Sequence, residues 1–354
     1  MRFAAILGEA RRDVVSGTAR VMVGFFTLLV IITLLGVADL LTISGLQTQA
    51  TAFVDAGAAT RGLGAKGQID ATVCENLSQV STIQASGAVA AADPIRFSAM
   101  PTVAIQAYRV TPGFAGVVGV TDPIPGGVWV DQGLADVMGI KAGQHLTTSQ
   151  GDALIGGVFA WPQDGRDQRL SFSMLIPQPA IGLFDECWLK AWPIVDSNDI
   201  LLRSTQIVSP NGGAALIAQI NKSFGINLDA NQLFTTRLTR FVPIVLLIAG
   251  LALGFVLTLT RRLEYASALH AGQSKGDQLA TCTLETAAWA VPATLVAIIS
   301  IWTTARALSM QDIPGLMAVD VRGPLLALIG AMLGALIGCA IAREKHLFRL
   351  FKAR

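Results

Sequence analysis

The sequence predicts an α-helical membrane protein with four transmembrane helices and a mixed α+β domain inserted between the first and second of them. Hydrophobic residues make up 52% of the 354-residue chain and charged residues only 14%, against the roughly 25% charged share of ordinary soluble domains. The apolar residues gather in four blocks, each close to the roughly 20 residues that a helix needs to cross a hydrocarbon core. A long stretch of soluble character separates the first two blocks.

The expected segments follow one another in a simple order along the chain. Each block becomes a span, and the polar stretches between the blocks become domains, loops or tails. The segments are an amphipathic elbow helix at 1–20, spans at 21–46, 239–260, 286–306 and 323–343, a large domain at 47–238, a polar segment at 261–285, a short loop at 307–322 and a basic tail at 344–354.

The positions of lysine and arginine predict which side of the membrane each segment faces. The short loop at 307–322 is poor in basic residues, with Arg322 inside it and Arg306 just before it, whereas the flanks of the other span ends are rich in them. Because cytoplasmic flanks carry the excess of positive charge, we expect a multi-pass protein of the cell membrane with both termini in the cytoplasm and the large domain outside. The net charge of +2 gives no reason to expect nucleic-acid binding. The basic residues on the cytoplasmic side are Arg2, Arg11, Arg12, Arg20, Arg261, Arg262, Lys275, Arg343, Lys345, Arg349, Lys352 and Arg354.

The elbow at 1–20 has apolar residues at helical spacing, among them Phe3, Ile6 and Leu7, while Arg2 and Arg12 fall on other faces. A helix of this kind beside a span can lie in the membrane interface. We favour this interpretation over a straight cytoplasmic continuation of the first span.

The large domain combines strand-like runs such as "TVAIQAYRVT" and "GVWVD" with short helical runs such as "QGLADVMGI", which predicts a mixed α+β fold. It also contains Cys74 and Cys187. Disulfides persist outside the cytoplasm, so a bridge between the two is one interpretation. Two independent thiols are the other, because a sequence does not show whether their Cα atoms lie within reach.

The polar segment at 261–285 is much longer than a turn between two spans requires. Gly272 can end a first helix, and Ser274, with Asp277 three residues later, can cap a second one. The pattern therefore predicts a rigid helix–turn–short helix that could insert into a groove on a partner. The alternative is that Arg261 and Arg262 only anchor the neighbouring spans at the headgroups.

Two spans carry small residues four positions apart, a spacing that lets helices approach closely in lipid. For Gly330, Gly334 and Gly338 we favour packing within the chain, whereas for Gly250 and Gly254 a dimer contact is the alternative. Asp39 lies in the outer half of the first span. A carboxylate there is costly and often functional, so a substrate or gating role stands beside the simpler possibility that it reaches the interface.

Two stretches carry a resemblance to MacB/FtsX-type ABC transporter permeases of the four-span, separate-ATPase type. The first, "GGVWVDQGLADVMGIKAGQHLTTSQGDALIGGVFAWPQDGR", is similar to the extracytoplasmic core of that family. The second, "RRLEYASALHAGQSKGDQLATCTLE", is similar to its cytoplasmic coupling segment, although His270 stands where the family often has arginine or lysine. The resemblance implies an ATPase-coupling role for Arg261, Arg262, Glu264, Tyr265, Leu269, His270, Gly272, Ser274 and Glu285.

The resemblance implies a transport subunit that is not itself an enzyme. No G-x-x-x-x-G-K-[ST] run is present, so ATP and Mg are expected in a separate ABC ATPase dimer, with no cofactor, metal or catalytic residue in this chain. A second permease copy, identical or similar, and membrane lipid complete the expected partners. Closure of the ATPases would drive export or extraction of a hydrophobic or amphipathic substrate, such as a peptide, a lipid or a toxic compound, by mechanotransmission. The alternatives are an FtsX-like signalling subunit that regulates an extracellular cell-wall hydrolase or sensor, and a membrane-anchored binding protein without an ATPase.

Overall fold

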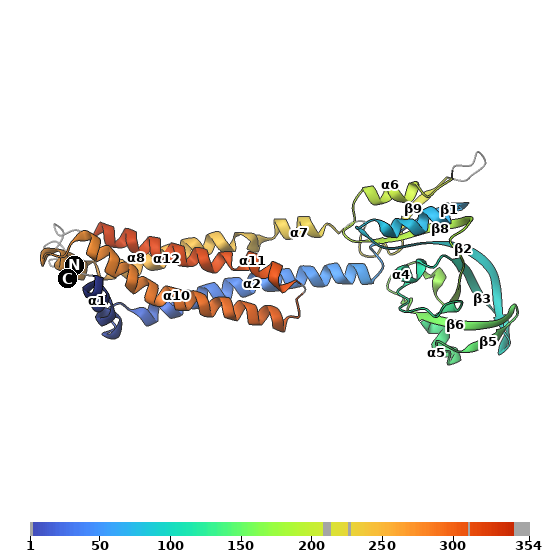
Figure 1. The fold of residues 1–354 in the computed structure, drawn as a ribbon, viewed down its shortest axis with the longest axis horizontal. Helices are drawn as coiled ribbons and strands as arrows, with labels where there is room; N and C mark the ends of the chain where they lie inside the picture. The colour runs from blue at the N-terminus through green and yellow to red at the C-terminus, as the bar shows by residue number, and fades with distance from the viewer. Residues whose placement is uncertain (1–2, 208–213, 226–227, 311, 343–354) are drawn as a thin grey trace. The chain divides into compact units, whose positions relative to one another are not determined.

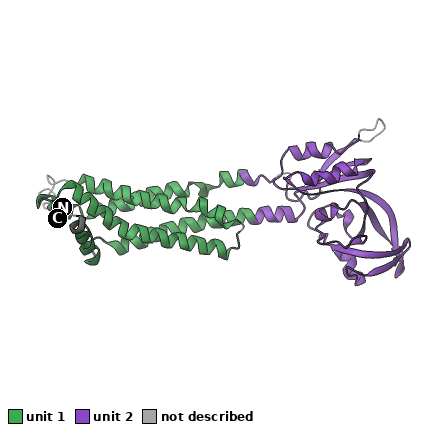
Figure 2. Ribbon diagram, viewed as in Figure 1, with its two compact units in different colours: residues 1–47, 232–354 green, residues 48–231 purple. Residues whose placement is uncertain are grey.

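The computed structural model describes residues 3–207, 214–225, 228–310 and 312–342, and the side chains from Ile6 onward. The chain divides into two compact units, one formed by residues 1–47 with 232–354 and the other by residues 48–231 (Figure 2). The first is a bundle of helices and the second is built on a large β-sheet (Figure 1). The basic tail predicted at 344–354 lies outside the described residues.

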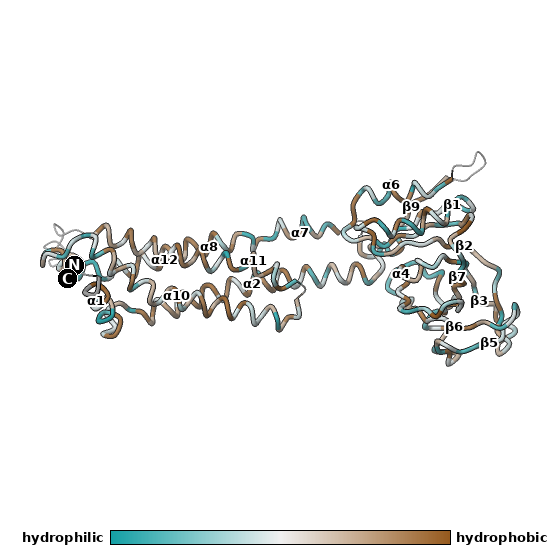
Figure 3. Tube along the Cα trace, viewed as in Figure 1, coloured by the Kyte–Doolittle hydropathy of each residue, from teal (hydrophilic) through white to brown (hydrophobic). Residues whose placement is uncertain are grey.

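Among its described residues, the helical unit contains four helices that are long and apolar enough to cross a membrane. They are α2 (Val21–Asp55), α8 with the turn η3 before it (Leu238–Thr260), α10 (Lys275–Ala307), and α11 with α12 (Ile313–Ile341). Figure 3 shows apolar residues concentrated along α2, α8, α10 and α12. The shorter helices of this unit are α1 (Phe3–Val15) and α9 (Arg262–His270), and α7 (Ala230–Thr236) leads into it.

Several boundaries differ from the sequence-based prediction. Helix α2 continues to Asp55, past the predicted end of the first span at 46. The second helix of the 261–285 segment is not a separate short helix but the first part of α10, which begins at Lys275 and continues without a break through Pro292 to Ala307. Nothing between Ser274 and Pro292 interrupts a helix, so the cap at Ser274 starts the whole span. The loop predicted at 307–322 also contains a short helix, α11 (Ile313–Asp320), which is capped by Asp312.

Helices α8 and α12 (Arg322–Ile341) make the closest contact in the bundle, and glycine permits it. A Cβ atom at Gly250 or Gly254 would overlap the backbone of Ala327 or Ala331, and one at Gly334 would overlap the backbone of Leu251. Gly330 and Gly338 also face α8. All five glycines singled out in the sequence therefore lie at one contact within the chain, where close backbone approach replaces side-chain packing.

The first span also packs against α10 through glycines, but here the glycines face side chains. A Cβ atom at Gly24 would lie 2.7 Å from the Trp289 ring, and one at Gly36 would lie 2.6 Å from Ile301. Leu28 and Ile32 are fully buried in the same apolar cluster. Large side chains of α10 thus fill spaces that the glycines of α2 leave open.

The described residues of the outer unit, defined as residues 48–231, form nine strands in the order β3-β7-β4-β6-β5-β2-β8-β1-β9. An additional pairing between β2 and β3 joins the two ends of the series β3-β7-β4-β6-β5-β2, so these six strands form a closed ring. The remaining strands β8, β1 and β9 continue the sheet outward from β2. The strands are β1 (Thr60–Asp70), β2 (Ile83–Phe97), β3 (Met100–Val110), β4 (Val128–Asp131), β5 (His145–Thr148), β6 (Gly151–Phe159), β7 (Ser173–Pro177), β8 (Leu183–Ala191) and β9 (Leu216–Gln219). Four short helices accompany them: α3 (Ala71–Asn76), α4 (Phe114–Val118), α5 (Gln132–Met138) and α6 (Ser197–Arg203).

A disulfide joins Cys74 of α3 to Cys187 of β8, with 5.8 Å between the Cα atoms. Both residues are fully buried in an apolar cluster that also contains Leu63 and Leu189. Of the two interpretations of these cysteines, the structure has the bridge. It closes a loop of 113 residues and so ties the helix α3 to the central part of the sheet.

Candidate functional site

The turn between α9 and α10 is held in one conformation by its own residues. Gly272 has φ of 93°, in the region that favours glycine. Ser274 caps α10: its Oγ accepts a hydrogen bond from the Asp277 backbone N–H at 3.2 Å and lies 2.7 Å from the Asp277 carboxylate. The sequence spacing predicts this cap, and the turn is accordingly ordered.

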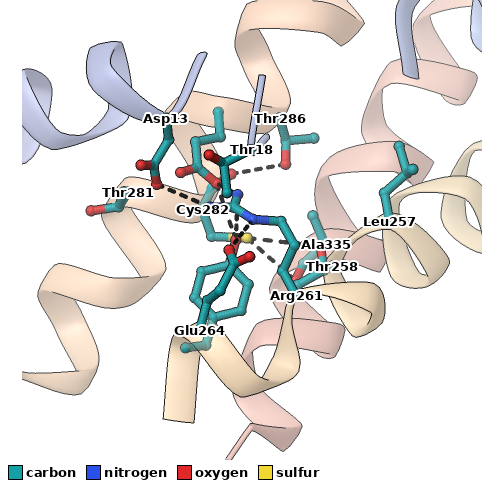
Figure 4. A network of polar contacts seen from close by, with 12 residues as sticks. Asp13, Thr18, Leu257, Thr258, Arg261, Glu264, Thr281, Cys282, Thr286 and Ala335 are labelled. Atoms are coloured by element: carbon teal, nitrogen blue, oxygen red, sulfur yellow. Dashed lines mark hydrogen bonds and ion pairs between the residues drawn. The ribbon is translucent and has the colours of Figure 1, made fainter. Parts of the chain in front are cut away.

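Arg261 lies at the junction of α8 and α9, and its side chain is only 8% exposed. Its guanidinium donates to Glu264 Oε2 at 2.8 Å, to Asp13 Oδ2 at 3.0 Å and to Glu285 Oε2 (Figure 4). These carboxylates come from α9, α1 and α10 respectively. A single arginine therefore binds three separate helices together. We call Arg261, Glu264, Glu285, Asp13 and the neighbouring Tyr265 the Arg261 cluster.

Tyr265 completes the cluster beneath the arginine. Its hydroxyl donates to Glu285 Oε2 at 3.1 Å, and the Arg261 guanidinium lies 5.2 Å from the centre of its ring. Burial raises the pKa of the Tyr265 hydroxyl, which keeps it protonated as a donor. Buried charges are tolerated only when they are paired and hydrogen-bonded, and removing one partner of a buried pair costs about 3–5 kcal/mol. The cluster is thus a strong positional constraint.

A second set of bonds ties the same turn to the end of α12. Lys275 Nζ donates to the backbone oxygens of Cys339 at 3.0 Å and Ala342 at 2.6 Å. These carbonyls end a helix, where a lysine is favourable because it satisfies them and opposes the helix dipole. The Gln278 amide donates to Tyr265 O at 2.9 Å, which joins α10 to α9.

The residues predicted to couple to an ATPase fall into two groups. Arg261, Tyr265 and Glu285 are buried within the chain. Arg262, His270, Gly272 and Ser274 are exposed around the turn, the Glu264 side chain is 52% exposed, and Leu269 is half-buried. The buried residues hold α9 and the start of α10 in place, and the exposed residues form the solvent-facing surface of this turn.

The sequence analysis did not identify three residues that belong to the site: Asp13, Lys275 and Gln278. Asp13 is 248 positions away from Arg261 in the chain, and no local pattern marks the pairing. Lys275 counts in the sequence only as one more basic residue near a span. The available signal was the polarity of Gln278 and Glu285 beside an apolar block, which is unexpected unless such residues are bonded.

The remaining predicted residue, Asp39, is buried in α2 and forms an ion pair with Arg237. Within the described ranges, no group of three or more His, Cys, Asp or Glu residues could hold a metal ion. Cys282 and Cys339 are buried free thiols.

Three solved structures resemble part of the chain. The periplasmic region of MacB from Actinobacillus actinomycetemcomitans matches at 12% identity over 46% of this chain and 89% of that one, with a TM-score of 0.34. A domain assigned to a permease protein from Porphyromonas gingivalis matches at 14% over 50% and 95%, with a TM-score of 0.32. The extracellular domain of the noncanonic ABC-type transporter YknZ from Gram-positive bacteria matches at 12% over 40% and 88%, with a TM-score of 0.28. No protein-family model and no curated protein matches the chain, and these structural likenesses are too distant to assign a function.

Proposed function

We propose that this chain is the permease subunit of a MacB/FtsX-like ABC transporter, and that it transmits force from a partner ATPase dimer to its own helices. The observation that carries the proposal is the Arg261 cluster. It joins α1, α9 and α10 through buried charges next to an exposed, rigid turn. An element that only connects two spans needs no such anchoring, whereas an element that is pushed must not yield.

The proposed mechanism follows the bonds outward from the turn. When the ATPases bind ATP and close, they press on the exposed residues around Gly272. The displacement passes through Arg261 to α1 and α10, and through Lys275 to the end of α12. Because α12 and α8 are in backbone contact, α8 moves with them. The helices then shift as one body instead of bending at the turn.

The proposed arrangement places the turn, α1 and both termini in the cytoplasm and the outer unit on the other side of the membrane. ATP and Mg belong to the partner ATPase in this scheme, and a second permease copy, identical or similar, completes the transporter. The disulfide in the outer unit supports this orientation, since such bonds persist in oxidising compartments.

A hydrophobic or amphipathic substrate fits a cavity of about 680 Å³ beside the outer end of α10. The lining of this cavity includes Ile299, Trp302 and Met317. Arg306 also lines it, and its guanidinium lies 4.2 Å from the centre of the Trp302 ring. An apolar cavity whose lining includes one cation, Arg306, and one carboxylate, Asp312, suits a molecule that has an apolar body and a polar end. Export or extraction of such a molecule is the transport reaction that we propose.

A signalling role without transport is the second candidate, and a polar cleft in the outer unit favours it. The cleft has a volume of about 440 Å³ and is lined by charged residues that include Arg166, Arg169, Glu186 and Lys222. Its chemistry suits a polar protein segment better than a hydrophobic substrate. A regulated extracellular hydrolase or sensor would bind there.

The proposal is tested by purifying the tagged full-length chain from its native membranes and measuring Mg-ATP hydrolysis by any P-loop ATPase that stays bound. We expect Arg262→Glu to release the ATPase, because Arg262 is exposed on α9. Arg203→Glu, which alters an exposed arginine at the end of α6 in the outer unit, is the control and should leave the complex intact. Purification of the chain with no ATPase bound would contradict the proposal. Stimulation of hydrolysis by amphiphiles would favour transport over signalling.

A further inference from the structure

Two buried carboxylates and one arginine meet near the outer ends of the helices, at the far end of the bundle from the Arg261 cluster. Asp39 comes from α2, Asp320 ends α11, and Arg237 lies just before η3 (Leu238–Phe241). Counted over the whole residue, Asp39 is 5% exposed and Asp320 is 9% exposed. All three line one cavity of about 130 Å³, which leaves room for a few water molecules.

The arginine is committed to one of the two carboxylates. Arg237 Nε lies 3.1 Å from Asp39 Oδ1, and both side chains are 8% exposed. Its Nη1 also donates to Phe234 O at 2.7 Å, and the guanidinium lies 3.9 Å from the centre of the Phe234 ring. Arg237 is therefore fixed on the Asp39 side of the cavity.

Asp320 forms no ion pair with the described residues, and the Arg237 charge that acts on it is already paired with Asp39. The Oδ2 atom of Asp320 is buried and receives no hydrogen bond from the described residues. Two further arginines line the cavity, but both are exposed. Arg240 donates to Thr235 O and stacks on Phe241, and no ion pair within the described ranges links Arg322 to either carboxylate. In this part of the chain, one buried positive charge thus faces two buried carboxylates.

An ionised carboxylate in this position is strongly disfavoured. Burying an unpaired charge costs several kcal/mol, and such a group normally becomes neutral instead. Two carboxylates that share one site do not both ionise, because each charge opposes the other. In a membrane protein, buried acids of this kind mark ion or proton sites.

We propose that Asp320 is a proton-binding site, in which the Asp39–Asp320 pair holds one proton and Arg237 neutralises the ionised member. A hydronium ion in the cavity gives its proton to Asp320: one O–H bond of hydronium breaks, one O–H bond forms at the carboxylate, a water molecule is left, and the net charge of the site rises by one. When the proton leaves, Asp320 becomes a second anionic acceptor for Arg237. Because Asp39 belongs to α2 and Asp320 to α11, loss of the proton allows α11, in addition to α2, to hold the segment that leads into α8. This inference does not depend on an ATPase partner.

Infrared spectroscopy of the full-length protein in lipid membranes tests the inference directly, because a protonated carboxyl has a C=O stretching band that an ionised carboxylate lacks. At neutral pH we expect Asp320→Asn to remove one such band. Asp39→Asn should remove it as well, since Arg237 is then free to pair with an ionised Asp320. Arg237→Gln should have the opposite effect and add a band, because both carboxylates lose their cation.

Asp312→Asn is the matched control. Asp312 is an exposed acid that caps the start of α11, the helix that Asp320 ends, and asparagine caps a helix equally well. The spectrum of this variant should equal that of the unchanged protein. If Asp320→Asn leaves the protonated bands unchanged, Asp320 is ionised and the inference is wrong. A band that persists in Asp39→Asn would show that the two acids do not share Arg237, which also overturns it. Both asparagine variants are isosteric, so the test does not rely on the folding of Arg237→Gln.

Discussion

At the residue scale, Arg261 and Arg262 are chemically identical neighbours with opposite environments. The Arg261 side chain is buried among three carboxylates, whereas Arg262 is exposed to solvent. The resemblance to a known family puts both residues in one motif. Burial and pairing separate a residue that holds the site from one that lies on its surface.

The two arginines therefore give a matched pair of substitutions. Arg261→Gln leaves Glu285 and Asp13 without their cation, so we expect it to lower the free energy of unfolding by about 3–5 kcal/mol. Arg262→Gln should change it by no more than about 0.5 kcal/mol. Denaturation of the purified protein in detergent, followed by circular dichroism, measures both. Equal effects of the two variants would show that the Arg261 cluster does not hold the helices together.

At the scale of elements, the turn between α9 and α10 depends on one backbone conformation. Gly272 and Gly276 are both exposed, with open space where a side chain would lie, but only Gly272 has a positive φ, of 93°. Alanine in that region costs roughly 1–2 kcal/mol. We expect Gly272→Ala to reduce ATP hydrolysis by the copurified complex, and Gly276→Ala, inside a helix, to leave it unchanged or to stabilise α10. Equal hydrolysis by both variants would contradict a rigid coupling turn.

The contact between α8 and α12 is a second element whose geometry can be tested. A methyl group at Gly254 would overlap the Ala331 backbone, while Gly45 of α2 has open space around it. Gly254→Ala should destabilise the bundle by about 1–3 kcal/mol through overpacking, and Gly45→Ala should not. Thermal unfolding in detergent distinguishes the two. A dimer contact at Gly254 would instead leave the unfolding of the single chain unchanged and alter only its association.

The same elements show what a sequence can predict here. The four apolar blocks and the cap at Ser274 follow from local rules, and both are found in the structure. The uninterrupted run of α10 does not follow from polarity, because a polar stretch can continue a helix and only a breaker ends one. The pairing of Arg261 with Asp13 and the meeting of Arg237 with Asp39 depend on helices distant in sequence, so no local pattern could reveal them.

At the scale of the whole molecule, the two units are stabilised by different means. Both units have buried apolar clusters and ion pairs, but the helical unit adds close backbone contact between α8 and α12, and the outer unit adds a disulfide. The bridge between Cys74 and Cys187 closes a loop of 113 residues. A loop of this length lowers the entropy of the unfolded chain, which stabilises the folded unit by about 4–5 kcal/mol. Replacing both cysteines with serine should lower the melting temperature of the outer unit and spare the helical unit. Calorimetry with separate transitions measures this, and a shift of the helical transition alone would refute it.

The division of the chain into units also sets an order for its synthesis. The outer unit is one continuous stretch, residues 48–231, so a ribosome delivers all of it, including both cysteines of the bridge, before α8 begins. The helical unit takes its parts from both ends of the chain. A newly made α2 must wait with Gly24 and Gly36 facing lipid until Trp289 and Ile301 arrive on α10. We therefore expect the helical unit to complete its packing only after the outer unit has been made, and a chain that is cut short before α10 to leave the surface of α2 around Gly24 and Gly36 unfilled.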